Sequence, residues 1–427
     1  MTPTRRSLLA AALTLPAAPF LARLARAAAP VDVAGPDALE GAIRAAAPGT
    51  VLRLAPGEYG RLAMQGGGGT KGAPLTLTAA DPAAPPRFDR MDLRQVAYLT
   101  LDGLDLEYRF ARGDKLTLRP FTVLGATGLT LRRLRIDGDR PTGVSPVDDG
   151  FGTGFGLSLR DGTDLLVEDC EIADFFVGLH ASRSRGVAVV GCNLHTLRMD
   201  GLKFTEIEGL RIEGNRIHDF NRSLDSQDHS DMIQIFTEGT TRPSRDVLIR
   251  NNLLSSGAGW FTQSIWMRNE VVSNGQAGPE MFYRNVTIEE NVIANAHVNG
   301  IYVGEAAGVA IRRNTVIRNA RSAGKRGRRG GPDQQNNLVL WTPIIRVAER
   351  STDVTIEANV TGGIKADAGQ PGWRVAGNVV VQDQSSIRPG YYGTVFDGDP
   401  ADPDRLRYRK DGPLDGAGVG ARRLQAD

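Results

Sequence analysis

The stretch VTIEENVI at residues 286–293 contains the pattern that decides the fold. Val286 and Ile288 alternate with polar residues, which is typical of a strand with one buried face, and Asn291 follows where such a strand would turn. The pattern recurs with Asn at residues 210–217, 247–254, 309–316, 354–359 and 373–380. Earlier copies have Leu in the Asn position at 99–106 and 129–136, and Cys at 165–172 and 187–194.

The spacing of these copies indicates a solenoid. Short intervals such as those from Leu165 to Val187 and from Val286 to Val309 are about 22–23 residues, which suits one turn of a β-solenoid. A single turn cannot cover its own apolar face, so the turns should stack with parallel strands about 4.8 Å apart. We therefore predict an all-β, single-stranded parallel β-helix of about 12 coils. A β-propeller or a β-sandwich is the alternative, but these have longer repeats or no recurring turn Asn.

The position held by Asn in most copies should form a column through the stack. An Asn there can bond to the Asn of the next coil and to backbone groups of the turn. Cys170 and Cys192 occupy this position in adjacent coils. Stacking would bring them within range of a disulfide, but two buried thiols are an equal alternative.

The first 29 residues have the features of a signal peptide. Arg5 and Arg6 precede an apolar run, and the run ends in an A-x-A site, so we predict a twin-arginine signal that is cleaved near Ala27. An anchoring helix is the alternative, but Pro16 and Pro19 would break it. We expect a periplasmic or secreted protein with no membrane span after cleavage.

The segment after the signal carries the first resemblance to a known fold. Residues 37–46 have the pattern of an amphipathic helix with Asp37 as its N-cap, and residues 48–59 follow as P-G-x-V-x-x-L-x-P-G-x-Y. This order resembles the opening of right-handed parallel β-helix proteins, in which the helix caps one end of the solenoid. We therefore predict a signal peptide at 1–29, a right-handed β-helix at 30–385 and a C-terminal cap or tail at 386–427.

Composition excludes some partners. The net charge is +2 and 41% of the 427 residues are apolar, so the chain can bury a large core but has no overall field to attract nucleic acid. We expect no nucleic-acid partner and a monomer.

Polar and aromatic residues gather at one place in five successive coils, in the strands at 178–181, 201–204, 232–235, 264–267 and 300–303. Alignment of these strands predicts an outward column of His180, Lys203, Gln234, Trp266 and Tyr302. Asp200, Asp231, Gln263 and Asn299 form a row beside it, with Arg198, His229 and Arg268 close by. Asp200 and Asp231 could instead cap turns, but an ordinary solvated strand face has no aromatic residues. We therefore take this strip as the candidate site.

An exported β-helix with such a strip resembles the polysaccharide lyases and the mannuronan C5-epimerases, across about residues 37–385. Lys203 with Arg198 or Arg268 is similar to the Lys/Arg pair of lyases of the chondroitinase B type. Asp228 and His229 with Asp231 are similar to the D-x-H cluster of the epimerases. The resemblance implies that a base removes the proton α to a uronate carboxyl. β-Elimination then gives a lyase, and reprotonation from the other face gives an epimerase.

That chemistry gives each residue an expected role. Lys203 or His229 would be the base, Tyr302 or His229 the acid, and Arg198 and Arg268 would neutralise the carboxylate. The residues expected to bind an anionic polysaccharide or oligosaccharide are His180, Asp200, Asp231, Gln234, Gln263, Trp266 and Asn299. The sequence identifies no definite cofactor, although Asp225, Asp228 and Asp231 could offer oxygen ligands to calcium.

Two further functions remain open at this stage. A glycoside hydrolase could use Asp200 and Asp231 as its carboxylate pair, since stacking places their backbones about 4.8 Å apart. A non-catalytic periplasmic glycan-binding protein is the other alternative.

Overall fold

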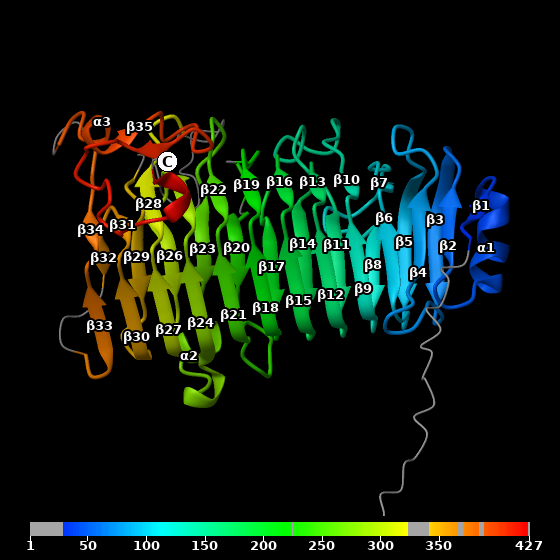
Figure 1. The fold of residues 1–427 in the computed structure, drawn as a ribbon, viewed down its shortest axis with the longest axis horizontal. Helices are drawn as coiled ribbons and strands as arrows, with labels where there is room; N and C mark the ends of the chain where they lie inside the picture. The colour runs from blue at the N-terminus through cyan, green and yellow to red at the C-terminus, as the bar shows by residue number, and fades with distance from the viewer. Residues whose placement is uncertain are drawn as a thin grey trace, which may run out of the picture.

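The computed structural model describes residues 29–223, 225–226, 228–322, 341–365, 370–383 and 388–425. These residues form one elongated solenoid, with the N-terminal coils at one end and the C-terminal coils at the other (Figure 1). The predicted right-handed parallel β-helix is confirmed. The predicted signal peptide lies outside the described residues apart from Ala29 and stays a prediction.

One long parallel sheet, here called sheet 1, contains 13 strands. Its strands in spatial order are β1 (Val31–Val33), β2 (Val51–Leu54), β4 (Leu75–Ala79), β6 (Leu99–Asp102), β9 (Thr127–Arg132), β12 (Thr163–Glu168), β15 (Arg185–Val190), β18 (Glu208–Glu213), β21 (Arg245–Arg250), β24 (Tyr283–Glu289), β27 (Ala306–Arg312), β30 (Thr352–Glu357) and β33 (Trp373–Ala376).

The other long sheet contains 21 strands that form two stacks. The groove ladder comprises β3 (Glu58–Gln65), β5 (Arg87–Arg94), β8 (Phe121–Leu124), β11 (Phe155–Arg160), β14 (Val177–Ser182), β17 (Leu202–Thr205), β20 (Asp231–Ile235), β23 (Gln263–Met267), β26 (Asn299–Val303), β29 (Ile344–Val347) and β32 (Ile364–Lys365). The lateral ladder comprises β7 (Asp105–Glu107), β10 (Arg135–Asp137), β13 (Glu171–Ala173), β16 (Asn193–His195), β19 (Arg216–His218), β22 (Leu253–Ser255), β25 (Val292–Asn295), β28 (Thr315–Arg318), β31 (Val360–Thr361) and β34 (Val379–Val380).

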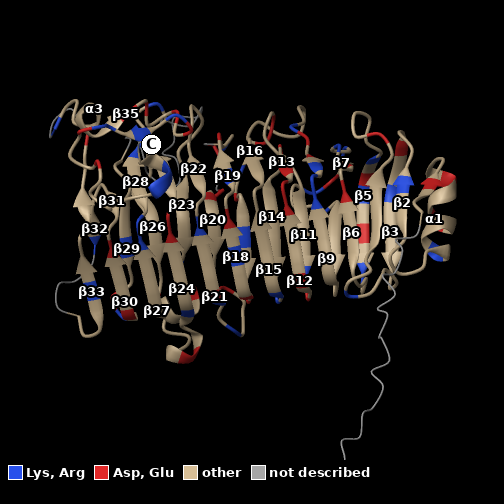
Figure 2. Ribbon diagram, viewed as in Figure 1, with Lys and Arg blue, Asp and Glu red and all other residues tan. Residues whose placement is uncertain are grey.

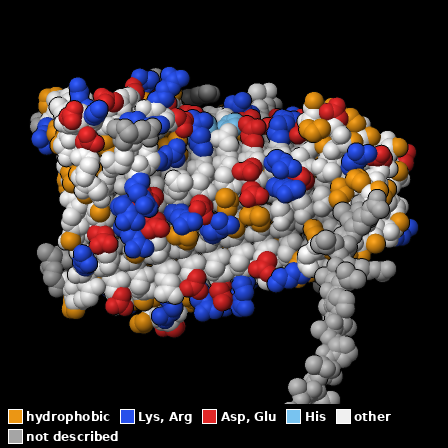
Figure 3. All heavy atoms as spheres, in the orientation of Figure 1, with side chains coloured by type: hydrophobic (Ala, Val, Ile, Leu, Met, Phe, Trp, Pro, Cys, Tyr) orange, Lys and Arg blue, Asp and Glu red, His pale blue; other side chains and the backbone are white. Residues whose placement is uncertain are grey.

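The core is a continuous column of apolar side chains inside the coils. The apolar residues of each repeat, such as Val286, Ile288 and Ile293, are buried and stack on their counterparts in the neighbouring coils. Charged side chains of both signs are intermixed on the outer face that Figures 2 and 3 present, in keeping with the small net charge. Among the described residues no helix is long and apolar enough to cross a membrane.

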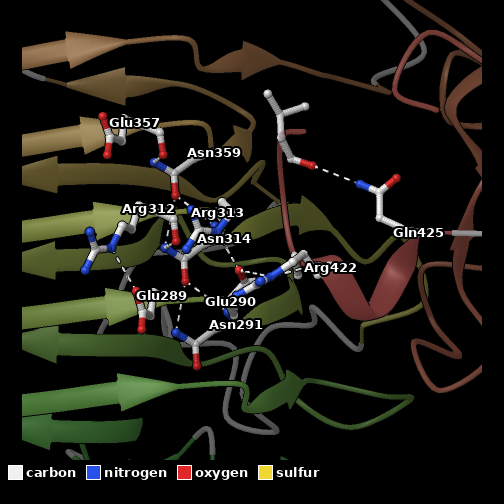
Figure 4. A network of polar contacts seen from close by, with 12 residues as sticks. Glu289, Glu290, Asn291, Arg312, Arg313, Asn314, Glu357, Asn359, Arg422 and Gln425 are labelled. Carbon is white, nitrogen blue, oxygen red and sulfur yellow. Dashed lines mark hydrogen bonds and ion pairs between the residues drawn. The ribbon is translucent and has the colours of Figure 1, made fainter. Parts of the chain in front are cut away.

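The recurring Asn residues form the predicted column. Asn215, Asn252, Asn291, Asn314 and Asn359 are buried, and the backbone N–H of each donates to Oδ1 of the Asn in the next coil at 2.9–3.0 Å. The side-chain amide of each also donates to that Oδ1, as Figure 4 shows for Asn291 and Asn314, and to a backbone carbonyl of the preceding coil, as Asn291 does to Ile249. The column therefore satisfies turn backbone groups inside the stack.

Cys170 and Cys192 continue this column as buried free thiols. The structure thus has the thiol alternative and no disulfide at this place. The hydrogen bond with Cys192, together with burial, raises the pKa of the Cys170 thiol well above its ordinary value. The thiol of Cys170 is therefore not primed for reaction.

The two ends of the chain cover different parts of the solenoid. Helix α1 (Pro36–Ala45) lies across the first coil and buries Leu39. Its N-cap is Gly35 and not Asp37, because Pro36 starts the helix and Asp37 lies in the first turn. The prediction of Asp37 as N-cap was wrong.

The C-terminal segment runs along one side of the last coils (Figure 1). It contains α3 (Tyr392–Val395), β35 (Phe396–Asp397), β36 (Arg407–Tyr408) and the short helix η2 (Arg422–Leu424). Apolar residues of this segment pack on outward residues of the lateral ladder, among them Leu253, Val292 and Val360. It is therefore a side cover for these coils.

The Asn column gives a first prediction. Replacing Asn291 with Ala should lower the free energy of unfolding by about 1–3 kcal/mol, because a buried rung leaves backbone and amide partners unsatisfied. Asn378 is the matched control, because it is the last rung and is only partly buried. Replacing Asn378 with Ala should lower the free energy of unfolding, measured by chemical denaturation, clearly less than replacing Asn291 does. Equal losses for both variants would contradict the column as a source of stability.

Candidate functional site

The groove ladder places the predicted outward column in register. His180 pairs with Lys203, Lys203 with Gln234, Gln234 with Trp266, and Trp266 with Tyr302 on successive strands. The same register extends the column in both directions, with Ser158, Thr122 and Asp92 toward the N-terminus and Arg346 and Lys365 toward the C-terminus. The repeat therefore lines up one polar and aromatic strip along the solenoid.

A pocket of about 370 Å³ lies over β17, β20 and β23 (Figure 1) and is called the central pocket. Its lining contains Lys203, His229, Gln234, Trp266 and Arg268, all predicted from sequence, together with Met199, Phe236, Glu238, Glu270 and Asn274. Phe236 and Glu238 come from the loop after β20. Glu270 and Asn274 come from the loop after β23, which carries α2 (Glu270–Ser273) and a short helix η1 (Pro279–Met281). The two loops thus wall the pocket.

Lys203 is held by a buried carboxylate. Its Nζ lies 2.7 Å from Oδ2 of Asp200, and it also lies 5.0 Å from the ring centre of Phe236. The side chain of Lys203 is 16% exposed, whereas Asp200 is fully buried. This pairing fixes a positive charge on the floor of the central pocket.

His229 has a corresponding carboxylate partner one coil further on. Its Nδ1 lies 2.9 Å from Oδ2 of the fully buried Asp231, while its own side chain is 43% exposed. On its other side, Nε2 lies 2.6 Å from the amide nitrogen of Gln263, and Oε1 of Gln263 accepts a hydrogen bond from Nδ2 of Asn299 at 2.5 Å. Asp231 and Gln263 therefore fix the plane of the imidazole, which faces the central pocket.

The carboxylate of Asp200 also contacts the backbone of the next coil. The backbone N–H of Asp231 donates to Oδ1 of Asp200 at 3.2 Å. Burial raises the pKa of Asp200 to about 6, and the charge of Asp231 adds to this against the opposing effect of Lys203. Burial also opposes protonation of His229, but the charge and hydrogen bond of Asp231 and the charge of Asp200 outweigh it and raise the pKa of His229 above its ordinary value.

The burial of Asp200 and Asp231 corrects their predicted role. Both were expected to bind substrate, but neither has exposed surface. Each instead holds the residue that reaches the pocket, Lys203 in one case and His229 in the other.

Aromatic residues continue the strip toward the C-terminus. Trp266 stacks on Tyr302 with ring centres 4.4 Å apart, and His229 lies 6.1 Å from Trp266. Tyr302 lines a separate pocket of about 250 Å³ with Arg346 and Lys365. Burial raises the pKa of Tyr302. The structure therefore brings Trp266 to His229 but places Tyr302 in the next pocket.

Arg198 does not line the central pocket, where its predicted role as a carboxylate neutraliser would require it. Its side chain is 2% exposed and is held by Asp148 at 2.8 Å and Asp228 at 2.7 Å. A guanidinium paired in this way is not available to a substrate carboxylate, so this location argues against Arg198 as a neutraliser. Asp148 comes from the insert between β10 and β11, and Asp228 from the insert that carries His229. Arg198 therefore ties the two inserts together.

Other contacts support the same junction between inserts. Asn221 donates to the carbonyl of Gly150 at 3.1 Å, and Ser223 donates to the carbonyl of Val147 at 2.7 Å. Ser230, just before β20, donates to the carbonyl of Arg198 at 3.0 Å. The segment around His229 is thus anchored on both sides.

The calcium hypothesis gains no support. The described residues contain no group of three or more His, Cys, Asp or Glu that could hold a metal ion. Asp228 is engaged by Arg198 and Ser226, and Asp231 faces His229. Calcium binding through Asp225, Asp228 and Asp231 stays an untested prediction.

Sequence reasoning missed Arg119, which lies beside His180. Its Nη1 lies 2.8 Å from Nδ1 of His180 and 3.1 Å from Oγ of Ser158. Arg119 precedes β8 in a loop, so the strand alignment gave no signal for it.

Comparisons with known proteins agree with the fold. A family profile described as the right handed beta helix region matches residues 125–262. The solved Dettilon tailspike protein matches with a TM-score of 0.50 and 15% identity, over 82% of this chain and 63% of that one, so this chain spans less than two thirds of the tailspike. No curated protein sequence matches this chain.

Two further solved structures match with lower TM-scores. An alginate lyase from Paenibacillus sp. strain FPU-7 has a TM-score of 0.41 and 11% identity, over 83% of this chain and 99% of that one. The A-module of a mannuronan C-5 epimerase from Azotobacter vinelandii has a TM-score of 0.43 and 14% identity, over 82% and 94%. The family profile and the coordinates together make this chain a right-handed parallel β-helix protein.

The environment of His229 gives the second prediction. Its pKa should lie above about 6.5, and replacing Asp231 with Asn should lower it, because the carboxylate that favours the imidazolium is lost. Titration of the imidazole signals by NMR measures both values. A pKa at or below the ordinary value in the wild type, or no change in the Asp231→Asn variant, would contradict the pairing.

Proposed function

We propose that this protein is a polysaccharide lyase that removes the C5 proton of a uronic acid residue and then eliminates the C4 oxygen. The observation that carries this proposal is the half-exposed imidazole of His229 on its buried carboxylate, in the same pocket as Lys203. A base and a fixed cation at one place are what α-proton abstraction from a carboxylate requires.

His229 fits the role of the group that transfers the proton. Asp231 orients its ring, and its exposed fraction lets it reach a sugar in the central pocket. The sequence left Lys203 as an equal candidate for the base. The ammonium group of Lys203, held by Asp200 on the floor of the central pocket, instead fits the stabilisation of an anion.

Lys203 and Arg268 fit the role of carboxylate neutralisers. Both line the central pocket, and Arg268 forms no ion pair within the described part of the chain. Removal of the C5 proton turns the uronate carboxylate into an enediolate with additional negative charge. Two cations at this place lower the energy of that intermediate.

The proposed reaction balances with the residues of the pocket alone. Nε2 of neutral His229, released from the amide of Gln263 when substrate binds, takes the proton from C5, the enediolate forms, and the C4–O bond breaks as the C4=C5 double bond forms. The imidazolium then gives its proton to the departing oxygen, which returns His229 to its starting state. Trp266 offers a flat apolar surface beside His229 on which a sugar ring can stack.

The burial of the two carboxylates argues against a glycoside hydrolase. A hydrolase needs carboxyl groups that reach the glycosidic oxygen and the anomeric carbon. Asp200 and Asp231 are fully buried beneath Lys203 and His229, so neither reaches the pocket surface.

Product analysis tests the reaction class. Incubation with a panel of uronate polymers should give oligosaccharides whose new non-reducing ends carry a C4=C5 double bond, detected by ultraviolet absorbance and mass spectrometry. Polymers of unchanged length with inverted C5 would show an epimerase. Saturated ends with an added water would show a hydrolase, and either result would overturn the lyase.

Turnover by variants tests the role of His229. His229→Ala should reduce turnover by about 10²–10⁴-fold, since the group that transfers the proton is lost. The variant should still fold, because His229 lies on an insert outside the repeat, but its melting temperature should fall because buried Asp231 loses its partner. The matched control is His195→Ala, since His195 lies on the lateral ladder, away from the central pocket. Near-wild-type turnover of His229→Ala would contradict the assignment.

A further inference from the structure

A second pocket, of about 520 Å³, adjoins the central pocket toward the N-terminus. It lies over β8, β11 and β14, and it shares Phe236 and Glu238 with the central pocket. His180 on its floor pairs with Lys203 in the next coil, so the two positions are about 4.8 Å apart along the solenoid. A chain lying along the groove ladder would pass from one pocket into the other.

Four arginines line this pocket, and one of them differs from the rest. Arg94 forms an ion pair with Asp92 at 2.9 Å, and Arg160 and Arg183 both pair with Asp161, at 3.4 and 2.7 Å. Arg119 forms no ion pair with any carboxylate of the described ranges. Its positive charge is therefore left without a protein counterion.

The contacts of Arg119 also set the state of His180. A guanidinium only donates hydrogen bonds, so Nδ1 of His180, 2.8 Å from Nη1 of Arg119, must be the acceptor. The ring proton is then on Nε2. Burial, together with the charges of Arg119 and Lys203, lowers the pKa of His180 to about 3, so the ring is neutral near neutral pH.

The rest of the arrangement holds the two side chains in place. Arg119 lies over the ring of Phe155 at 4.3 Å and also donates to Ser158, while the ring of His180 meets that of Phe155 at 6.1 Å. Arg119 thus has a fixed direction although it is exposed. An unpaired guanidinium beside a neutral N–H donor is a site for an anion.

We propose that Arg119 and His180 form a subsite for the acidic group of a sugar residue that neighbours the one in the central pocket. This inference rests on the proposed function and makes it more specific, since it requires a substrate with acidic groups on adjacent or nearly adjacent residues. The carboxylate of a second uronate is the group we favour, because a planar carboxylate matches the guanidinium fork. A sulfate ester has the same charge and is a separate arm of the test.

Direct binding tests the subsite without turnover. Isothermal titration calorimetry on the His229→Ala background measures the Kd of oligogalacturonate, oligomannuronate, their carboxyl-reduced forms and a sulfated neutral oligosaccharide, each of about four to six residues. Arg119→Gln should weaken binding of an acidic probe by about ten-fold or more, as expected for loss of a charge-assisted contact. The Arg119→Gln substitution should leave the Kd of the carboxyl-reduced oligosaccharides unchanged. An effect on the uronates identifies a carboxylate subsite, and an effect on the sulfated probe alone identifies a sulfate subsite.

Matched variants exclude indirect effects. Arg250→Gln removes an arginine that pairs with Glu213 on sheet 1, outside both pockets, and should leave every Kd unchanged. Arg119→Lys keeps the positive charge but lacks the guanidinium fork, so it should recover part of the affinity for the acidic probes. Such a recovery would show that the weak binding of Arg119→Gln comes from the lost charge and not from misfolding.

The outcomes separate the subsite from the lyase. Binding that depends on Arg119, in a wild-type protein that turns over no uronate polymer, would reject the lyase and keep the subsite. Equal affinity of wild type and Arg119→Gln for all acidic probes, or no binding of any acidic probe, would overturn the subsite whatever the activity.

Discussion

The structure depends on the in-register stacking of coils that have no stable core of their own. Each coil buries its apolar residues only because the coil above and the coil below cover them, as Val286 is covered by Val247 and Val309. The Asn column fixes the turn at the same place in each coil, because each Asn bonds to the backbone of its neighbours. Stacking therefore determines which outward side chains become neighbours, even where they are 20 to 40 positions apart in sequence, as Lys203 and Gln234 are.

This constraint accounts for what the sequence could and could not predict. The order from His180 to Tyr302 followed from counting strand positions, since the register of a repeat is the same in every coil. The partners of Arg198 were out of reach, because Asp148 and Asp228 come from inserts whose paths do not follow the repeat. Arg119 was missed for the same reason. The burial of Asp200 and Asp231 was also not predicted, since both were expected to bind substrate and are fully covered.

Those two carboxylates explain why the inserts matter. Two buried carboxylates in adjacent coils would be costly unless each has a cation or a proton close by. Lys203 supplies one from the repeat itself, while His229 supplies the other from the insert after β19. The anchoring of that insert through Arg198 therefore stabilises the charge balance beneath the pocket as well as the position of the imidazole.

The protonation of His229 consequently depends on the protonation of Asp200, and the two groups titrate together. Asp200 has a pKa of about 6, and the pKa of His229 is raised above its ordinary value, so both groups change state in a neighbouring pH range. A proton lost from His229 makes the site more negative and makes a proton on Asp200 more favourable. Such exchange would let the imidazole accept a proton from a substrate without leaving two uncompensated charges in the interior. His180, whose pKa is about 3, lies outside this exchange and stays neutral, which separates the part of the strip suited to proton transfer from the part suited to holding an anion.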